Sequence, residues 1–313
     1  MMKGLELSRI YFEEYGKQMI DSQLAQYRPY MAVGLVGEGS ECLGFDDEIS
    51  MDHDFGPAFC IWVPEEIYTK AGAVMQRAYD SLPAFCQGYT RITSAQGGGR
   101  IGVLTLEGFY RKFTGLSQAP QDNMEWFRIP ERFLATVTNG EVFVDHLGTF
   151  SQIRSALKAF YPEDVLKKKL AARCAVMAQA GQYNYGRCMK RGDSQAAYLA
   201  CGEFIRTAMS TVYLLNEAYM PYYKWMFRGA RDFRILNDEV DLMAEMTQIT
   251  DQQENSRCKE QMIEQICIAV GRELNRRGFT RSTDAFLQTQ GEELMRGIRD
   301  ARLRNLHIMA DND

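Results

Sequence analysis

Two short segments in the first sixty residues combine residue types suited to phosphate and metal chemistry. Residues 37–40 (GEGS) end an apolar run that begins at Met31. Glycines there let the backbone approach an anion, and free amides at a following helix start would face a phosphate. After a spacer of eleven residues comes Asp52-His53-Asp54. In an extended segment the two carboxylates project from one face, where they repel each other unless a cation lies between them. The pattern predicts a site for Mg²⁺ and a phosphate-bearing ligand.

Two other interpretations fit the same residues. One is a solvated loop, because acid-x-acid pairs arise often by chance in a chain with 41 acidic residues. The other is a calcium-like structural site that also uses Asp46-Asp47-Glu48, although the segment lacks the alternating ligands and closing glutamate of a helix–loop–helix calcium loop. From the residues alone, the metal–phosphate site and these alternatives stay equally open. Cys42, close to this segment, is more typical of packing than of a nucleophile.

The elements that must position these residues differ between the two halves of the chain. In the first half, apolar runs bounded by Gly and Pro predict strands at residues 31–36, 54–63, 100–106 and 141–145. Helical spacing of apolar residues predicts helices at 5–26, 64–82 and 124–138. From Pro162 onward, only helices are predicted, at 163–179, 193–218, 231–248, 254–277 and 283–308. The sequence thus predicts an α+β protein, with a mixed-sheet domain at 1–159 and an all-helical domain at 160–313.

Composition excludes several classes of protein. The 313 residues are 46% apolar and 25% charged, as in a globular protein, and no window approaches the roughly 18 uninterrupted apolar residues of a membrane span. The net charge of −5 disfavours a large nucleic acid as a partner. The eight cysteines and three histidines lack the spacing of a zinc site. Because the N-terminus has no signal-peptide pattern, we expect a cytoplasmic protein with no membrane partner.

The motif of Gly39-Ser40, an eleven-residue spacer and Asp52-x-Asp54 resembles the signature of the DNA polymerase beta-like nucleotidyltransferase superfamily. The longer string GLVGEGSECLGFDDEISMDHDFGP is similar to a bacterial family of uncharacterised nucleotidyltransferase-like proteins. In that family we also expect segments like GEVFVDHLG, GQYNYGRCMKRGD and LLNEAYMPYYKWMFR. The resemblance to this family covers nearly the whole chain, and the resemblance to enzymes of known activity covers about residues 30–110.

The resemblance implies a nucleotidyltransferase fold and a role for each residue of the motif. Gly39 and Ser40 would hold the β- and γ-phosphates of a nucleoside triphosphate, and Asp52 and Asp54 would bind Mg²⁺. The superfamily usually adds a third carboxylate, which serves a second Mg²⁺ ion or deprotonates the acceptor. Asp145, at the end of the strand predicted at 141–145, is the preferred candidate for this catalytic and metal-binding role. Glu107 and the absence of a third acid are the alternatives.

The helical half contains two patches that combine polar, aromatic and basic residues. The first is residues 181–185 (GQYNY) with Arg187, Lys190 and Arg191, and the second is residues 222–225 (YYKW) with Arg228. Aromatic residues at helical spacing are more often core, and runs of Arg and Lys are more often solvated. Antibiotic nucleotidyltransferases, in which a helical domain closes the nucleotide cleft, resemble this plan. The resemblance therefore implies nucleotide binding by Arg187, Lys224 and Arg228.

Together these expectations describe a cytoplasmic, Mg²⁺-dependent nucleotidyltransferase. It would transfer a nucleoside monophosphate from a nucleoside triphosphate to a hydroxyl or phosphate acceptor and release pyrophosphate, with two Mg²⁺ ions. A small molecule is the favoured acceptor, and the helices predicted at 254–277 and 283–308 serve packing or a homo-oligomer. The alternative is a catalytically decayed nucleotide-binding or interaction module, such as a partner in a toxin–antitoxin-like pair.

Overall fold

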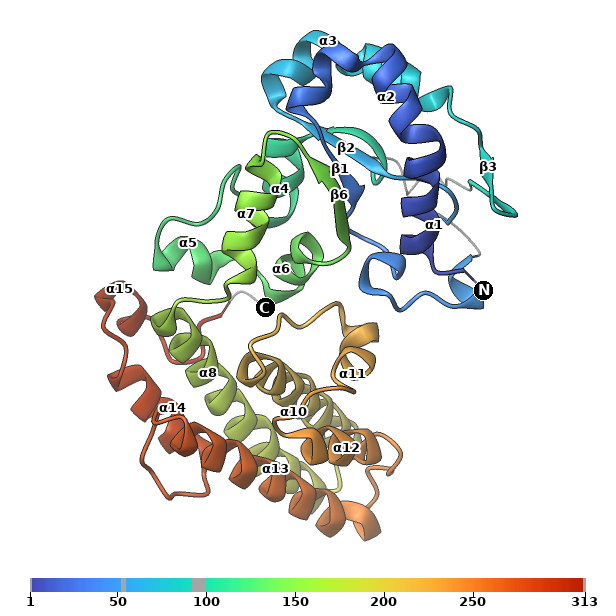
Figure 1. The fold of residues 1–313 in the computed structure, drawn as a ribbon. Coiled ribbons are helices and arrows are strands. Elements are labelled where there is room, and N and C mark those ends of the chain that lie inside the picture. The colour runs from blue at the N-terminus through green and yellow to red at the C-terminus, as the bar shows by residue number, and fades with distance from the viewer. Residues whose placement is uncertain (1, 52–54, 92–98, 312–313) are drawn as a thin grey trace. The chain divides into compact units, whose positions relative to one another are not determined.

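The computed structural model describes residues 2–51, 55–91 and 99–311, which divide into two compact units (Figure 1). The first unit comprises Met1–Ala119 and Phe133–Ala159, and the second comprises Pro120–Arg132 and Phe160–Asp313. The segment Pro120–Arg132, expected in the first domain, clusters with the helical unit instead. The fold is α+β, as expected, with a mixed sheet in the first unit and a helical second unit. That each part folds as an independent domain stays a prediction.

The first unit contains a four-stranded sheet in the order β5-β2-β1-β6. Its strands are β1 (Ala32–Leu35), β2 (Cys60–Val63), β5 (Gly102–Thr105) and β6 (Glu141–Asp145). Strand β1 is antiparallel to both of its neighbours, with Ala32 opposite Trp62 and Asp145, whereas β2 and β5 are parallel. The chain therefore leaves β1 at the sheet edge where the other three strands begin. A separate hairpin pairs β3 (Phe85–Cys86) with β4 (Tyr89–Thr90).

Successive side chains along these strands point to opposite faces of the sheet, and each face packs against a layer rich in aromatic residues. Val33, Ile61 and Val103 belong to the core with residues of α1–α3, and the indole of Trp62 stacks on Phe150 of α7 on the other face. The helices of this unit are α1 (Gly4–Tyr11), α2 (Lys17–Gln23), α3 (Glu65–Asp80), α4 (Leu106–Thr114) and α7 (Thr149–Lys158), and α6 (Glu131–Thr138) lies mostly in it. A π-helical turn, η1 (Phe12–Gly16), joins α1 to α2, and η2 (Ala25–Tyr30), η3 (Glu41–Leu43) and η4 (Glu48–Met51) are 3₁₀ turns.

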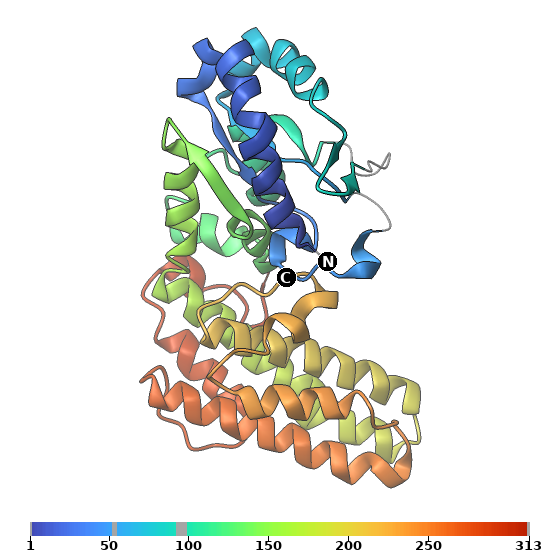
Figure 2. The same ribbon diagram turned by 45° about the vertical axis from the view of Figure 1, so that its right-hand side comes forward.

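The second unit is built from α5 (Asn123–Arg128) and the helices after Tyr161. A long helical stretch consists of α8 (Glu163–Met177), the π-helix η5 (Ala178–Tyr185) and α9 (Gly186–Lys190). Packed with it are α10 (Ser194–Leu215), α13 (Ser256–Arg276) and α14 (Leu287–Arg296) (Figure 2). The shorter helices are α11 (Met226–Gly229), α12 (Asn237–Met246) and α15 (Ala301–Arg304), with 3₁₀ turns η6 (Tyr223–Trp225) and η7 (Gln253–Asn255). No helix in the described ranges is both long and apolar enough to cross a membrane.

Two helices expected from the sequence are each divided in the structure. The one predicted at 124–138 ends at Arg128 and resumes as α6, because Pro130 lacks the amide that a continuous helix needs. The one predicted at 283–308 gives α14 and α15, separated around Gly297. The helices predicted at 193–218 and 254–277 match α10 and α13 to within three residues. The one predicted at 163–179 continues through η5 and α9 to Lys190, and the one predicted at 231–248 begins only at Asn237.

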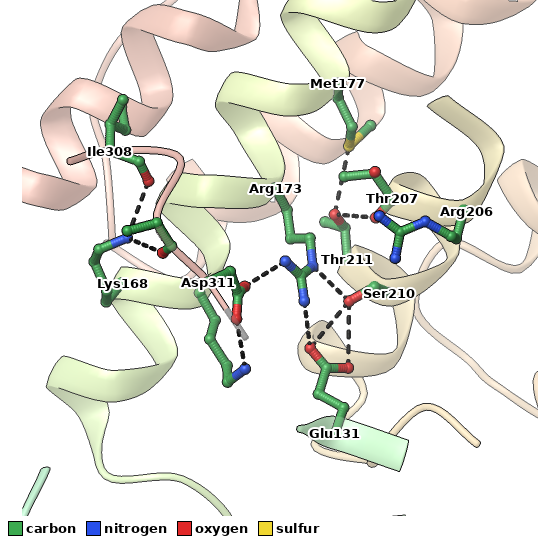
Figure 3. Close-up of polar contacts among 12 residues, drawn as sticks. Glu131, Lys168, Arg173, Met177, Arg206, Thr207, Ser210, Thr211, Ile308 and Asp311 are labelled. Carbon is green, nitrogen blue, oxygen red and sulfur yellow. Dashed lines mark hydrogen bonds and ion pairs between the residues drawn. The ribbon is translucent and has the colours of Figure 1, made fainter. Parts of the chain in front are cut away.

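The second unit also buries a network of charges around α8 (Figure 3). Arg173 donates to Glu131 over 2.9 Å and to Ser210 over 2.7 Å, and it forms an ion pair with Asp311. Lys169 also pairs with Asp311, at 2.9 Å, and Lys168 donates to the backbone carbonyls of Ile308 and Ala310. The chain segment that contains Asp311 is thereby fixed to α8.

Candidate functional site

The loop after β1 has a backbone that only glycine adopts readily. Gly37 and Gly39 have φ angles of +132° and +124°, in a region essentially closed to other residues. Asn139 holds the loop from the side of β6: its Nδ2 donates to the Gly37 carbonyl over 2.8 Å, and its Oδ1 accepts from the Gly37 amide at 3.0 Å. Among the described residues, the amides of Gly39 and Ser40 donate to no protein acceptor. The loop thus presents two adjacent backbone donors.

A partly buried ion pair crosses over this loop. Arg100 donates to a carboxylate oxygen of Glu41 over 2.8 Å and to the Glu38 carbonyl over 2.7 Å. A Cβ built on Gly39 would overlap both the Arg100 Nη2 atom and the Glu41 carboxylate. Burial raises the pKa of the Glu41 carboxyl, an effect that the positive charge of Arg100 opposes. The pair therefore holds the chain on both sides of Gly39, and it leaves no room for a side chain there.

A cavity of about 120 Å³ lies beside the loop. Gly37, Glu38, Arg100, Thr105 and Lys112 are among the residues that line it. The ammonium group of Lys112 pairs with the Glu38 carboxylate over 2.6 Å, and both side chains are about half exposed, at 52% and 48%. An exposed pair of this kind contributes little to stability, so Lys112 is able to exchange Glu38 for an anionic ligand at small cost. Two loop residues, Gly37 and Glu38, and two cationic side chains thus line one small cavity next to the amides of Gly39 and Ser40 in the chain.

The two aspartates of the sequence motif, Asp52 and Asp54, lie outside the described residues, as does His53. Within the described ranges, no group of three or more Asp, Glu, His or Cys side chains is arranged to hold a metal ion. Asp46 accepts a hydrogen bond from the Gly4 amide over 2.8 Å, and Asp47 accepts from Ser50. These two carboxylates therefore stabilise the chain locally, which gives no support to the calcium-like interpretation.

Asp145 does not lie near the loop, contrary to the expectation of a shared site. It pairs with Ala32 at the start of β1, whereas the loop comes after Leu35 at the strand's other end. At about 3.3 Å per residue, this separates the two along the sheet by at least about 10 Å. The Asp145 carboxylate accepts from the amides of Gly148 at 2.8 Å and Ser151 at 2.7 Å. Its observed role is to cap the N-terminus of α7.

Glu107, the alternative third acid, lies at that same far edge of the sheet. It comes directly after β5 and Leu106, and its carboxylate accepts a hydrogen bond from the amide of Glu65 over 2.9 Å. Glu65 is the first residue of α3, so Glu107 stabilises the positive end of that helix. Cys42 is buried, and burial raises the pKa of its thiol well above the ordinary value. This agrees with packing rather than with a thiolate nucleophile.

The basic residues expected to bind a nucleotide from the helical half lie in the second unit. Arg187 lines a cavity in that unit, with its guanidinium 4.8 Å from the centroid of the Tyr183 ring. Lys224 and Arg228 both lie over the ring of Trp225, at 5.0 Å and 5.6 Å from its centroid. Because these three residues belong to a different unit from the loop, their binding to a nucleotide held there stays a prediction.

Sequence reasoning missed three residues that shape the loop, namely Arg100, Glu41 and Asn139. Arg100 comes after three consecutive glycines in the sequence, and its distance of 59 residues from Glu41 is not a pattern that a sequence reveals. Asn139 does carry a signal, because it precedes Gly140 and the strand that pairs with β1. Lys112, close in sequence to Glu107, pairs instead with Glu38, which lies 74 residues before it.

Comparisons with known proteins identify one family and one similar structure. Residues 126–226, about a third of the chain, match the model of a family described as a domain of unknown function (DUF4037). A crystal structure of a nucleotidyltransferase-like protein from Exiguobacterium sibiricum is similar over 89% of this chain and 88% of that one, with 11% identity and a TM-score of 0.39. No curated protein sequence matches the chain. Since the TM-score is this low and the family match covers only part of the chain, a function is inferred from the motif and the loop.

Proposed function

We propose that the first unit binds a nucleoside triphosphate at the loop after β1 and transfers its nucleotidyl group to an acceptor. The observation that carries this proposal is the pair of adjacent amides of Gly39 and Ser40, which have no acceptor among the described residues. The fixed backbone around them gives phosphate oxygens preorganised donors, which cost no reorganisation when the ligand binds. The spacing of Ser40 from Asp52 and Asp54 adds the motif of the nucleotidyltransferase superfamily.

The residues of the unit have distinct tasks in this proposal. The loop amides and the hydroxyl of Ser40 orient the terminal phosphates, and Lys112 neutralises charge as pyrophosphate leaves. Arg100 and Glu41 keep the loop in its binding conformation. Asp52 and Asp54 form an oxygen donor pair of the kind that Mg²⁺ prefers, and the ion would supply charge neutralisation at the triphosphate. Asp145 has no part in this site, since its carboxylate caps α7.

A nucleotide-binding module without turnover is the second candidate function. It is favoured by a specific observation: both acids considered for the third carboxylate, Asp145 and Glu107, serve helix N-termini at the far edge of the sheet. A site with only Asp52 and Asp54 would bind a nucleotide and lack the group that deprotonates an acceptor.

The test compares binding with turnover in the full chain. Calorimetric titration with each of the four nucleoside triphosphates and Mg²⁺ measures binding, and pyrophosphate release in the presence of a cell metabolite extract measures turnover. We expect Asp52→Asn and Asp54→Asn to abolish turnover. Asp145→Ala, whose carboxylate lies at the opposite sheet edge, is the matched control and should retain the nucleotide affinity of the wild type.

Each result selects one conclusion. Binding with pyrophosphate release that depends on Asp52 and Asp54 supports the transferase. Binding without release under any extract supports the module. If the wild-type chain binds none of the triphosphates, or if the Asp52→Asn variant turns over normally, the proposed site is wrong.

A further inference from the structure

A cavity of about 930 Å³ in the second unit lies between the η5–α9 segment and α13. Four cationic side chains line it, those of Arg187, Lys190, Arg257 and Arg272. Within the part of the chain that the structure describes, none of the four has an ion-pair partner. Three glutamates, Glu239, Glu260 and Glu264, also line the cavity, so the four cations leave its lining with a net charge of +1 in a protein of net charge −5.

Contacts between the two walls show which of these cations lie together. The Gln182 amide nitrogen donates to Glu264 over 2.8 Å, and a Cβ built on Gly186 would lie 3.1 Å from a carboxylate oxygen of Glu260. As residue numbers rise along η5 and α9, those of their partners on α13 fall, so the segments run antiparallel. Continuing this register by one turn brings Lys190 beside Arg257.

Arg187, Lys190 and Arg257 therefore gather at one end of the cavity, and we call them the basic end. Arg257 lies in the first turn of α13, a helix of 21 residues, where the helix dipole adds positive potential. Glu260 is the carboxylate that lines this end, and it already accepts a hydrogen bond from the Ser256 hydroxyl over 2.8 Å. Three cations thus face one carboxylate, so the local charge is positive.

Arg187 is also held in place before any ligand arrives. Its guanidinium packs on the ring of Tyr183, which is 52% exposed, and both residues line the cavity. A stacked guanidinium keeps its donors available, because ring contact uses its face and not its N–H groups. The wall that carries both residues includes a π-helix, a distortion that often accompanies functional sites.

We propose that the basic end binds a small phosphorylated molecule. Arginine and lysine side chains without counterions are the groups that proteins use to recognise phosphate oxygens. The volume is in the range of pockets for small molecules. A nucleic acid extended along the cavity would meet the carboxylates of Glu239, Glu260 and Glu264, whereas a small ligand at the basic end meets three cations and Glu260 alone. This site lies within the second unit and does not depend on the function proposed for the first.

The test uses pyrophosphate as the probe in calorimetric titration of the full chain at low ionic strength. We expect Arg187→Gln and Arg257→Gln each to weaken binding at least tenfold, and Lys190→Gln to weaken it as well. Arg272→Gln is the matched control. It removes the same charge from the same cavity, but 15 residues along α13 places it about 22 Å from Arg257, so binding should persist.

A second control separates this site from the loop of the first unit. Lys112→Gln removes a cation from that loop and should leave pyrophosphate binding at the basic end unchanged. The inference is overturned if the wild type does not bind pyrophosphate, if Arg187→Gln and Arg257→Gln bind it as the wild type does, or if only Lys112→Gln loses binding. Tighter binding of a short single-stranded RNA than of pyrophosphate, dependent on Arg257, would also overturn the choice of a small ligand. Melting temperatures equal to that of the wild type confirm that each variant is folded.

Discussion

Substitution of Gly39 by alanine tests directly whether the ion pair over the loop controls its conformation. The new Cβ would occupy the space of the Arg100 guanidinium and the Glu41 carboxylate, so that pair would have to separate. The alanine would in addition retain a φ angle of +124°, which residues with a Cβ rarely adopt. We therefore expect Gly39→Ala to lower both the stability of the first unit and its affinity for a nucleoside triphosphate.

The expected loss of stability has two contributions. Backbone strain at this φ costs about 1–3 kcal/mol. Loss of the charged hydrogen bond between Arg100 and Glu41, whose side chains are only 20% and 13% exposed, costs about 1.5–3 kcal/mol more. The sum is about 2.5–6 kcal/mol, and at about 2–4 °C per kcal/mol for a unit of this size the melting temperature should fall by at least about 5 °C.

Gly44→Ala provides the matched control. Gly44 also has a positive φ, +72°, but a Cβ built on it meets nothing within 4 Å. The Gly44→Ala substitution therefore introduces backbone strain alone, which should lower stability by about 1 kcal/mol and the melting temperature by about 2–4 °C. Thermal and urea unfolding, followed by circular dichroism and by the fluorescence of buried Trp62, measure both variants. Equal stability of Gly39→Ala and Gly44→Ala would refute the argument that the ion pair governs the loop.

Three further predictions concern groups elsewhere in the chain. Asp145→Ala should destabilise the first unit by about 1–2 kcal/mol, through loss of the α7 cap, and leave triphosphate affinity unchanged in a parallel titration. Glu131→Gln should lower stability in urea unfolding by about 3 kcal/mol because Arg173 is buried, whereas Glu203→Gln, in an exposed pair with Arg206, should change it by less than about 1 kcal/mol. Burial lowers the pKa of Lys168 to about 8, so between pH 8 and about 10 the unfolded chain binds more protons than the folded one. The contribution of Lys168 to stability should therefore rise with pH across that window, so the stability of the wild type relative to a Lys168→Met variant in the same urea series should increase from pH 8 to about 10.

The sequence predicted the positions of helices and strands along the chain better than the directions in which the strands run in the sheet. The strand at 141–145 coincides with β6, and the helices at 193–218 and 254–277 begin and end within three residues of α10 and α13, because apolar periodicity and caps are local signals. The helix at 163–179 begins where α8 does, but the helical stretch continues through η5 and α9 to Lys190. The order β5-β2-β1-β6 is not local. It depends on packing between segments a hundred residues apart, so nothing near Ala32 indicated that β1 runs opposite to its neighbours.

The direction of β1 explains why Asp145 lies away from the loop. The end of a buried strand collects ligands in a parallel sheet, where all such ends share one edge. Here the loop follows β1, which is antiparallel to β6, so the loop lies at the edge of the sheet where β6 begins. Asp145, at the end of β6, lies at the opposite edge. The glycines of the loop were recognisable from the sequence, because positive φ angles restrict residue type. The Arg100–Glu41 contact was not, because no residue type or spacing restricts a long-range ion pair.

The attachment of the Ile308–Asp311 segment to α8 bears on the order in which contacts of the second unit form during synthesis. The acceptors of Lys168 lie 140 or more residues after it, and Asp311, shared by Lys169 and Arg173, lies equally late. At roughly 5–20 residues per second, a ribosome needs about 7–28 s to extend the chain from one to the other. During that interval Arg173 has Glu131 as a counterion, but Lys168 and Lys169 lack the partners that they have in the folded chain, and water must serve them instead. Burial of these two ammonium groups is therefore a late event in the formation of the second unit.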